Sequence, residues 1–181
     1  FNTVDSMGAN FINSCLEKIA KSIKSLYSKS DLINENNIDI IMSILSNYVP
    51  NCLVKTWVSC PVNELNEDND LSANKFAKRF IQAVKISEVD PYRAVTHNKG
   101  IMNGIDSLAM ATGNDFRAIE AGVHAYASRN GSYSGLTKAS IKDGIFTLEL
   151  TIPLSIGTVG GLTNLHPLAV SYTHLTLPTK A

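Results

Sequence analysis

The sequence has no excess of charge of either sign and no long hydrophobic run. Its 16 Lys and Arg residues balance 16 Asp and Glu residues, so the formal net charge is zero at pH 7. Non-specific nucleic-acid binding relies on a basic excess that attracts phosphates, so this composition argues against a nucleic-acid partner. A membrane-spanning helix needs about 20 consecutive apolar residues. No run in this sequence reaches that length, so no membrane association is predicted.

Cysteine is scarce and has no pattern. The three cysteines, Cys15, Cys52 and Cys60, cannot all pair within one chain, and none has the CxxC spacing of a zinc or redox site. His97 and His124 likewise lack metal-ligand spacing, which favours local hydrogen bonds for both. Walker and GxGxxG patterns are missing as well. These absences predict reduced thiols in a cytoplasmic protein that has no metal site.

Apolar residues make up 44% of the 181 residues, which is enough for one ordinary domain or two small ones. Apolar periodicity predicts helices over residues 11–27, 38–48 and 71–84, a helical stretch after Asp90-Pro91, and a helix from residue 114 onward. Strands are predicted over residues 52–62, 133–141 and 145–152, the last two as a hairpin across Asp143-Gly144. The order of these elements predicts an α+β fold with a domain boundary near residues 47–51.

The stretch from residue 90 to 129 organises the chain. Its polar residues gather at helix starts and turns instead of along one solvated face. They comprise a basic cluster (Arg93, His97, Lys99), two amides (Asn98, Asn103) and a Gly-Asn-Asp turn at residues 113–115. Free backbone N–H groups at such positions converge on a ligand. Ile101, Ile105 and Leu108 are predicted to face inward. Composition and spacing together predict an enzyme fragment that binds an anionic ligand.

Each candidate residue also has an ordinary structural interpretation. Lys99 is either partly desolvated, so that it holds a developing oxyanion, or a surface lysine. Asp115 either orients Lys99 or caps a helix, a role worth about 1 kcal/mol. Arg93 either clamps a carboxylate or pairs with Asp90. Asn103 either binds substrate or is solvated. Spacing alone leaves all four alternatives open.

Four segments of the sequence resemble hydroxymethylglutaryl-CoA (HMG-CoA) reductases, and the bacterial class II form in particular. They are Asp5-x-Met7-Gly8-x-Asn10, residues 90–106, residues 111–127 and the Gly-rich segment 156–161. The resemblance covers residues 1–169. It implies that HMG-CoA takes two hydrides from NADPH or NADH and passes through mevaldehyde to mevalonate and CoA, or that the enzyme runs in reverse. The alternatives are a non-catalytic CoA- or nucleotide-binding module, or a structural fragment without activity.

The resemblance also implies a role for each matching residue. Lys99 matches the catalytic lysine and Asp115 the aspartate of the Gly-Asn-Asp turn. Arg93 and Asn103 match contacts to the HMG moiety. The cofactor-binding motif of the family matches Asp5, Met7, Gly8 and Asn10. The catalytic glutamate of the family is expected upstream of Phe1 and its catalytic histidine downstream, so the chain alone is expected to be inactive.

The domain organisation follows from the same resemblance. Residues 1–48 are expected to be part of a ferredoxin-like, NAD(P)-binding small domain, and residues 49–169 part of a large domain for HMG-CoA binding and dimerisation. Residues 170–181 resemble one reading frame of a sequencing adaptor and are expected to be non-native, the alternative being a flexible natural terminus. The resemblance further implies a homodimer with active sites at the interface.

The spacing of Lys99 and Asp115 makes its own prediction. They bracket a helical stretch, residues 101–111, that spans about 16 Å at 1.5 Å per residue. A hydrogen bond needs about 3 Å. Either the chain folds back sharply at residues 112–113, or the two side chains meet from different subunits, which we favour.

Overall fold

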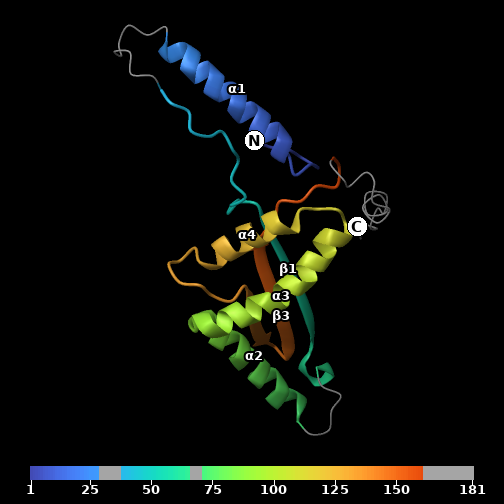
Figure 1. Ribbon diagram of the computed structural model, residues 1–181. Coiled ribbons are helices and arrows are strands. Elements are labelled where there is room, and N and C mark those ends of the chain that lie inside the picture. The colour runs from blue at the N-terminus through green and yellow to red at the C-terminus, as the bar shows by residue number, and fades with distance from the viewer. Residues whose placement is uncertain (29–37, 66–70, 161–181) are drawn as a thin grey trace. The chain divides into compact units, whose positions relative to one another are not determined.

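The computed structural model describes residues 1–28, 38–65 and 71–160. By internal contacts the chain divides into two compact units. One comprises residues 1–47 together with the described residues from 156 onward, and the other comprises residues 48–155. The described residues form four α-helices, a short 3₁₀ helix and three β-strands (Figure 1). The α+β class is therefore confirmed.

A three-stranded antiparallel sheet forms one layer of the larger unit. It contains β1 (Leu53–Pro61), β2 (Thr137–Lys142) and β3 (Ile145–Pro153) in the order β1-β3-β2. The predicted hairpin joins β2 to β3, and its two turn residues both have positive φ, 51° at Asp143 and 77° at Gly144. Asp-Gly suits such a turn because aspartate tolerates the left-handed region and glycine enters it freely.

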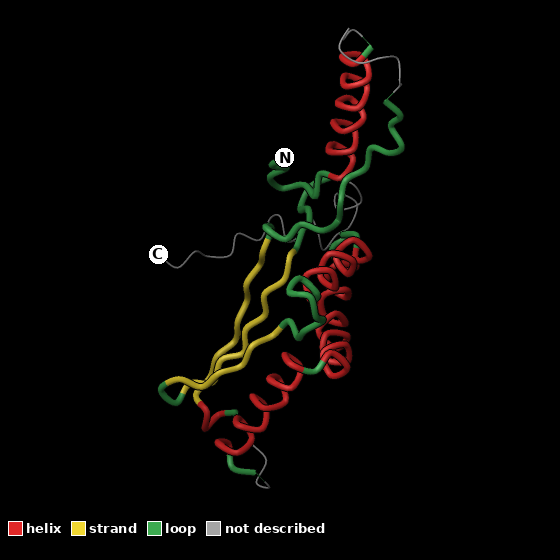
Figure 2. Tube along the Cα trace, turned by 90° about the vertical axis from the view of Figure 1, so that its left-hand side faces the viewer, coloured by secondary structure: helices red, strands yellow, loops and turns green. Residues whose placement is uncertain are grey.

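Helices cover one face of this sheet, as Figure 2 shows. They are α2 (Ala73–Val89), α3 (Pro91–Ala111) and α4 (Phe116–Ala127), and the 3₁₀ helix Val62–Glu64 follows β1. Under α2, the rings of Phe80 and Phe146 meet edge to face with centroids 5.3 Å apart. A second core cluster joins Met102 of α3, Val123 of α4 and Ile152 of β3. Together these contacts fix α3 and α4 against the sheet.

Helix α3 begins where the sequence predicts, because Asp90 accepts a hydrogen bond from the Tyr92 N–H at 3.0 Å and Pro91 occupies the first turn. The predicted inward stripe is partly wrong. Leu108 is 56% exposed. The fully buried positions are Ala94, Asn98, Met102 and Ala109. The buried face carries two alanines, an amide and a methionine, so the positions of the larger isoleucine and leucine residues did not predict it correctly.

The smaller unit contains α1 (Ala9–Tyr27), which begins after Gly8, a residue in the left-handed region at φ 78°. The Thr158 N–H donates to the Asp5 carbonyl at 2.8 Å. At Gly157, a Cβ atom would lie only 2.8 Å from the Met7 nitrogen, so this close approach requires glycine. The first and last sequence motifs, some 150 residues apart, are thereby brought together.

The predicted helix over residues 38–48 is wrong, since this segment forms neither helix nor strand. It contains four isoleucines, whose β-branched side chains lose freedom in a helix. The Leu45 N–H instead donates to Asn13 Oδ1 at 2.9 Å. Helix α1 itself was predicted correctly, but its apolar face, including Phe11 and Ile19, has no buried residue.

Candidate active site

The exposed face of α3 carries two predicted site residues, one catalytic and one substrate-binding. Lys99 and Asn103 are four residues apart, so they lie one above the other on this face, and both are exposed. Arg93 is half-buried nearer the start of the helix. Apart from their own stretch of helix, no described atom lies within 4 Å of the place where a Cβ of Gly100 or Gly104 would be. The face is therefore open, with a cation and an amide available to a ligand.

His97 takes no part in that open face. Its Nε2 lies 2.6 Å from the Thr137 Oγ1, which joins α3 to the start of β2. Burial lowers the pKa of His97, and the neighbouring charge of Arg93 lowers it further. A lowered pKa keeps the imidazole neutral at pH 7. The prediction of a local hydrogen bond is confirmed.

The expected position of Asn98 was also wrong. It was placed among the ligand-facing amides, but it is fully buried. Its Nδ2 donates to the Ser134 carbonyl at 2.9 Å, and its Oδ1 accepts from the Leu136 N–H at 3.0 Å. The amide thus satisfies two backbone groups of the segment leading into β2. In the sequence, the only sign of this was the spacing of Ala94, Asn98 and Met102, which lie four residues apart and so share one side of the helix.

Asp115 caps α4, the ordinary role that the sequence left open. Its Oδ1 accepts from the N–H groups of Arg117 at 3.1 Å and Ala118 at 3.3 Å. The same oxygen lies 3.5 Å from Arg117 Nε. The side chain is 44% exposed. In the described part of the chain all of these contacts use Oδ1, so Oδ2 can still meet a donor from another molecule.

Lys99 and Asp115 do not meet within the described chain. Helix α3 runs unbroken to Ala111, and the Asn114 N–H donates to the Ala109 carbonyl at 2.8 Å. That bond holds the Gly-Asn-Asp turn at the last turn of α3. Ala109 lies ten residues beyond Lys99, about 15 Å along the axis. The reversal at Gly113, with φ 70°, therefore does not bring Asp115 back to Lys99.

The sequence did not predict the pair of carboxyl groups, Asp106 and Glu120, that lies between α3 and α4. The Asp106 Oδ1 is buried and has no hydrogen-bond partner among the described residues. Burial raises the pKa of Asp106 most, and a hydrogen bond with Glu120 and the charge of Glu120 raise it further, while His124 acts in the opposite sense. His124 lies one turn beyond Glu120, and its Nδ1 is 2.8 Å from the Tyr133 hydroxyl. Nothing in the spacing of an Asp and a Glu on separate helices signals such a pair.

The Asp106 pair predicts a pH-dependent stability. The pKa of Asp106 is raised in the folded state. Its stabilising contribution to the free energy of unfolding is therefore fully present below pH 3.8, the ordinary pKa, and is lost as pH rises through the folded pKa. Asn at this position mimics the protonated acid. We therefore expect Asp106→Asn to gain stability relative to the unmodified chain as pH rises from about 4 to 8, measured by urea unfolding. The exposed Glu88→Gln serves as control, and a pH-independent difference for Asp106→Asn contradicts the prediction.

The cofactor motif lies around the start of α1. Asp5 is in the turn that accepts the Thr158 N–H, Met7 contacts the Gly-rich segment, and Gly8 precedes the helix. No side chain caps the first turn of α1, and that turn, which includes Asn10, holds no acidic residue. Free N–H groups at a helix start suit a phosphate.

Comparison with known proteins identifies the family. A family model described as hydroxymethylglutaryl-coenzyme A reductase matches residues 1–180. The 3-hydroxy-3-methylglutaryl-coenzyme A reductase of Archaeoglobus fulgidus is 35% identical over 166 residues, which cover 91% of this chain and 34% of that protein. The probable reductase of Borreliella burgdorferi is 37% identical over 161 residues, which cover 89% of this chain and 35% of that protein.

Solved structures agree. A 3-hydroxy-3-methylglutaryl-coenzyme A reductase of Streptococcus pneumoniae is 37% identical with a TM-score of 0.79, over 96% of this chain and 44% of that one. A class II reductase from the same organism, bound to NADPH in open conformations, is 38% identical with a TM-score of 0.78, over 96% of this chain and 44% of that one.

These matches also set a limit, because the chain spans about a third of the length of the curated relatives. Among the described residues, no helix has the length and apolar character needed to cross a membrane. The same residues hold no group of three or more side chains suited to a metal ion. The family match, the sequence identities and the shared fold establish that this chain belongs to the hydroxymethylglutaryl-coenzyme A reductase family.

Proposed function

We propose that the protein containing this chain reduces HMG-CoA to mevalonate and CoA with two equivalents of NADPH or NADH. The observation that carries the proposal is the open face of α3, where Lys99 and Asn103 stand exposed beside two uncovered glycines. The family membership and a class II relative whose structure holds NADPH support it.

Lys99 is proposed to stabilise the oxyanion that forms when the substrate is reduced. A thioester carbonyl gains negative charge on oxygen when it accepts a hydride, and an ammonium group stabilises that charge. Arg93 offers a guanidinium fork that suits the free carboxylate of the HMG group, and Asn103 offers an amide to its hydroxyl. A bound nicotinamide supplies the hydride. The chain's own residues hold the substrate and stabilise the oxyanion.

Asp5, Met7, Gly8 and Asn10 are proposed to hold the dinucleotide. The N–H groups of the first turn of α1 lack side-chain caps, which fits a pyrophosphate. We assign residues 1–48 to a ferredoxin-like small domain and residues 49–169 to the large domain.

Asp115 is proposed to act in the active site of a partner subunit. Within one chain it is held at the last turn of α3, about 15 Å along the helix from Lys99. Its Oδ2 remains able to accept from a lysine of another subunit. The proposal therefore requires a homodimer whose active sites lie at the interface.

The test is NAD(P)H oxidation that depends on HMG-CoA, measured with the complete protein that carries this sequence. We expect oxidation of at least one of the two nucleotides, with about two equivalents consumed for each mevalonate formed. Binding of CoA without any oxidation would instead identify a non-catalytic binding module. The 181-residue chain assayed alone should be inactive.

A further inference from the structure

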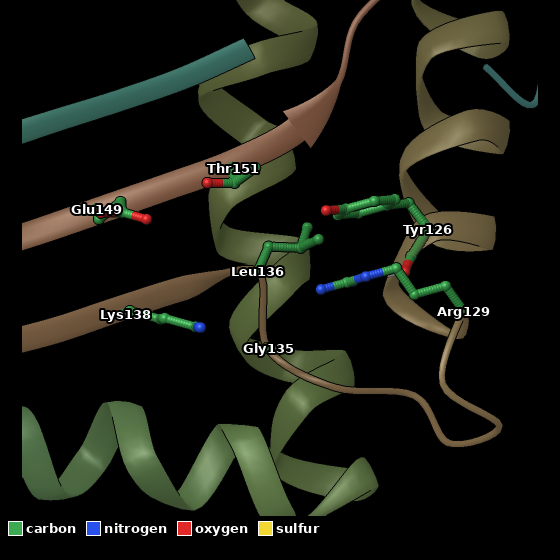
Figure 3. Close-up of a pocket in the computed structure, with 7 residues that line it drawn as sticks. All are labelled: Tyr126, Arg129, Gly135, Leu136, Lys138, Glu149 and Thr151. Carbon is green, nitrogen blue, oxygen red and sulfur yellow. Dashed lines mark hydrogen bonds between the residues drawn. The ribbon is translucent and has the colours of Figure 1, made fainter. Parts of the chain in front are cut away.

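A pocket of about 140 Å³ opens at the C-terminal end of α4 (Figure 3). Tyr126 and Arg129 line it from the end of that helix, Leu136 from the segment before β2, and Lys138, Glu149 and Thr151 from the strands. None of these residues lies on α3. The pocket is therefore a separate feature from the exposed face that carries Lys99.

Arg129 is held in place before any ligand arrives. Its guanidinium carbon lies 3.8 Å from the centre of the Tyr126 ring, and its Nη1 donates to the Tyr126 carbonyl at 2.8 Å. A guanidinium has five N–H donors, so most of this group remains available. Because the fork is already ordered, binding costs little side-chain entropy. In Figure 3 the group points into the pocket from the side of α4.

Lys138 approaches the same space from the opposite side (Figure 3). Its direct neighbour across the strands is Glu149. However, the Glu149 carboxylate lies 2.6 Å from the Lys55 ammonium, so its charge is already balanced. Neither Arg129 nor Lys138 forms an ion pair among the described residues. The pocket therefore carries a local excess of positive charge in a chain whose net charge is zero.

The size of the pocket limits the ligand. A cavity of about 150 Å³ holds a benzene molecule, so a pocket of about 140 Å³ accommodates a compact group of roughly five or six heavy atoms. A tetrahedral phosphate or a carboxylate is within that size, and because the pocket is open to solvent, the rest of a larger molecule can lie outside it. Tyr126 and Thr151, which also line the pocket, carry hydroxyl groups that can act as hydrogen-bond donors.

We propose that this pocket binds one oxyanion group, held by the Arg129 fork and the Lys138 ammonium. The arrangement fits a phosphate or carboxylate oxygen pair facing the planar guanidinium. The site is independent of the proposed reductase chemistry, since it shares no residue with the predicted active site. It should bind its ligand whether or not the protein turns over HMG-CoA.

The test is titration calorimetry of the full chain with inorganic phosphate at low ionic strength. We expect saturable binding that weakens about tenfold in Arg129→Gln, the loss of one charge-assisted hydrogen-bonded contact. Lys138→Gln should weaken binding by a smaller but measurable factor. Lys142→Gln, at the far end of the same strand and outside the pocket, is the matched control and should leave the affinity unchanged.

Further arms identify the source of the oxyanion. Glycerol phosphate that binds as tightly as phosphate indicates a phosphate group on a larger molecule, and acetate that binds better indicates a carboxylate. No saturable binding, or equal affinity in both pocket variants, would overturn the proposal. If Arg129→Gln fails to fold by circular dichroism, Lys138→Gln decides the result, because the Lys138 side chain has no hydrogen bond or ion pair in the described chain.

Discussion

Lys99→Ala in the complete protein should lower kcat for HMG-CoA-dependent oxidation of NADPH or NADH by about 10²- to 10³-fold, the usual effect of removing one oxyanion donor. Because Lys99 is exposed on α3 and its side chain has no hydrogen bond or ion pair among the described residues, removal of that side chain should leave the fold intact. Steady-state kinetics and circular dichroism measure the two effects. Lys85→Ala, an exposed lysine on α2, is the matched control and should retain full activity.

Asp115→Ala should also inactivate the protein, but its cause needs separating from the loss of a helix cap. Mixing the Lys99→Ala and Asp115→Ala proteins under conditions that exchange subunits provides the separation. If each active site takes Lys99 from one subunit and Asp115 from its partner, one of the two sites in a heterodimer is intact. About a quarter of normal activity should then return, since half of the dimers are mixed and each has one working site. No recovery, with proven exchange, would contradict the shared site.

Replacement of Asn98 should have the largest effect on stability. Asn98→Leu keeps a similar volume but leaves the buried Leu136 N–H and Ser134 carbonyl without their partner. Each unsatisfied buried group costs about 1–3 kcal/mol, so the free energy of unfolding should fall by roughly 2–5 kcal/mol. Urea unfolding followed by circular dichroism measures this loss. The exposed Asn74→Ala on α2 controls for loss of an amide.

Asn98→Asp divides this effect into its two halves. The carboxylate still accepts from the Leu136 N–H but no longer donates to the Ser134 carbonyl. It should be less stable than the unmodified chain. Protonation of the acid restores a donor, so acidic pH should recover part of the loss. A loss of under 1 kcal/mol in Asn98→Leu would mean that water replaces the amide, and the tethering role would then be wrong.

Local patterns were sufficient where short-range geometry decides the structure. Asp143-Gly144 predicts its hairpin because few other dipeptides tolerate two positive φ angles. Asp90-Pro91 predicts the start of α3 because the side chain caps the helix and proline suits its first turn. In the isoleucine-rich segment over residues 38–48, the local pattern predicted a helix that the structure does not have. Periodicity alone does not separate a helix from an extended segment there, and the β-branched isoleucines disfavour a helix.

In the candidate site, too, the sequence predicted some features and the tertiary structure decided others. The sequence motifs identified the family and selected Lys99, Arg93, Asn103 and Asp115, and the family match confirms the first of these two results. Their roles stay predictions. Whether each neighbouring polar residue is buried or exposed depends on which face of α3 packs against the sheet. Asn98 and Lys99 are adjacent in sequence, yet one is fully buried and the other exposed.

By itself the sequence determined the family, the α+β class, the main helices, the sheet hairpin and the polar residues that cluster near α3. These depend on contacts between neighbours and on motif spacing. Only the tertiary structure decided that Asn98 tethers the segment before β2, that Asp106 meets Glu120, and that Arg129 and Lys138 share a pocket. Each of these pairs joins residues on separate elements. Their meeting follows from how helices pack on the sheet, which no local pattern records.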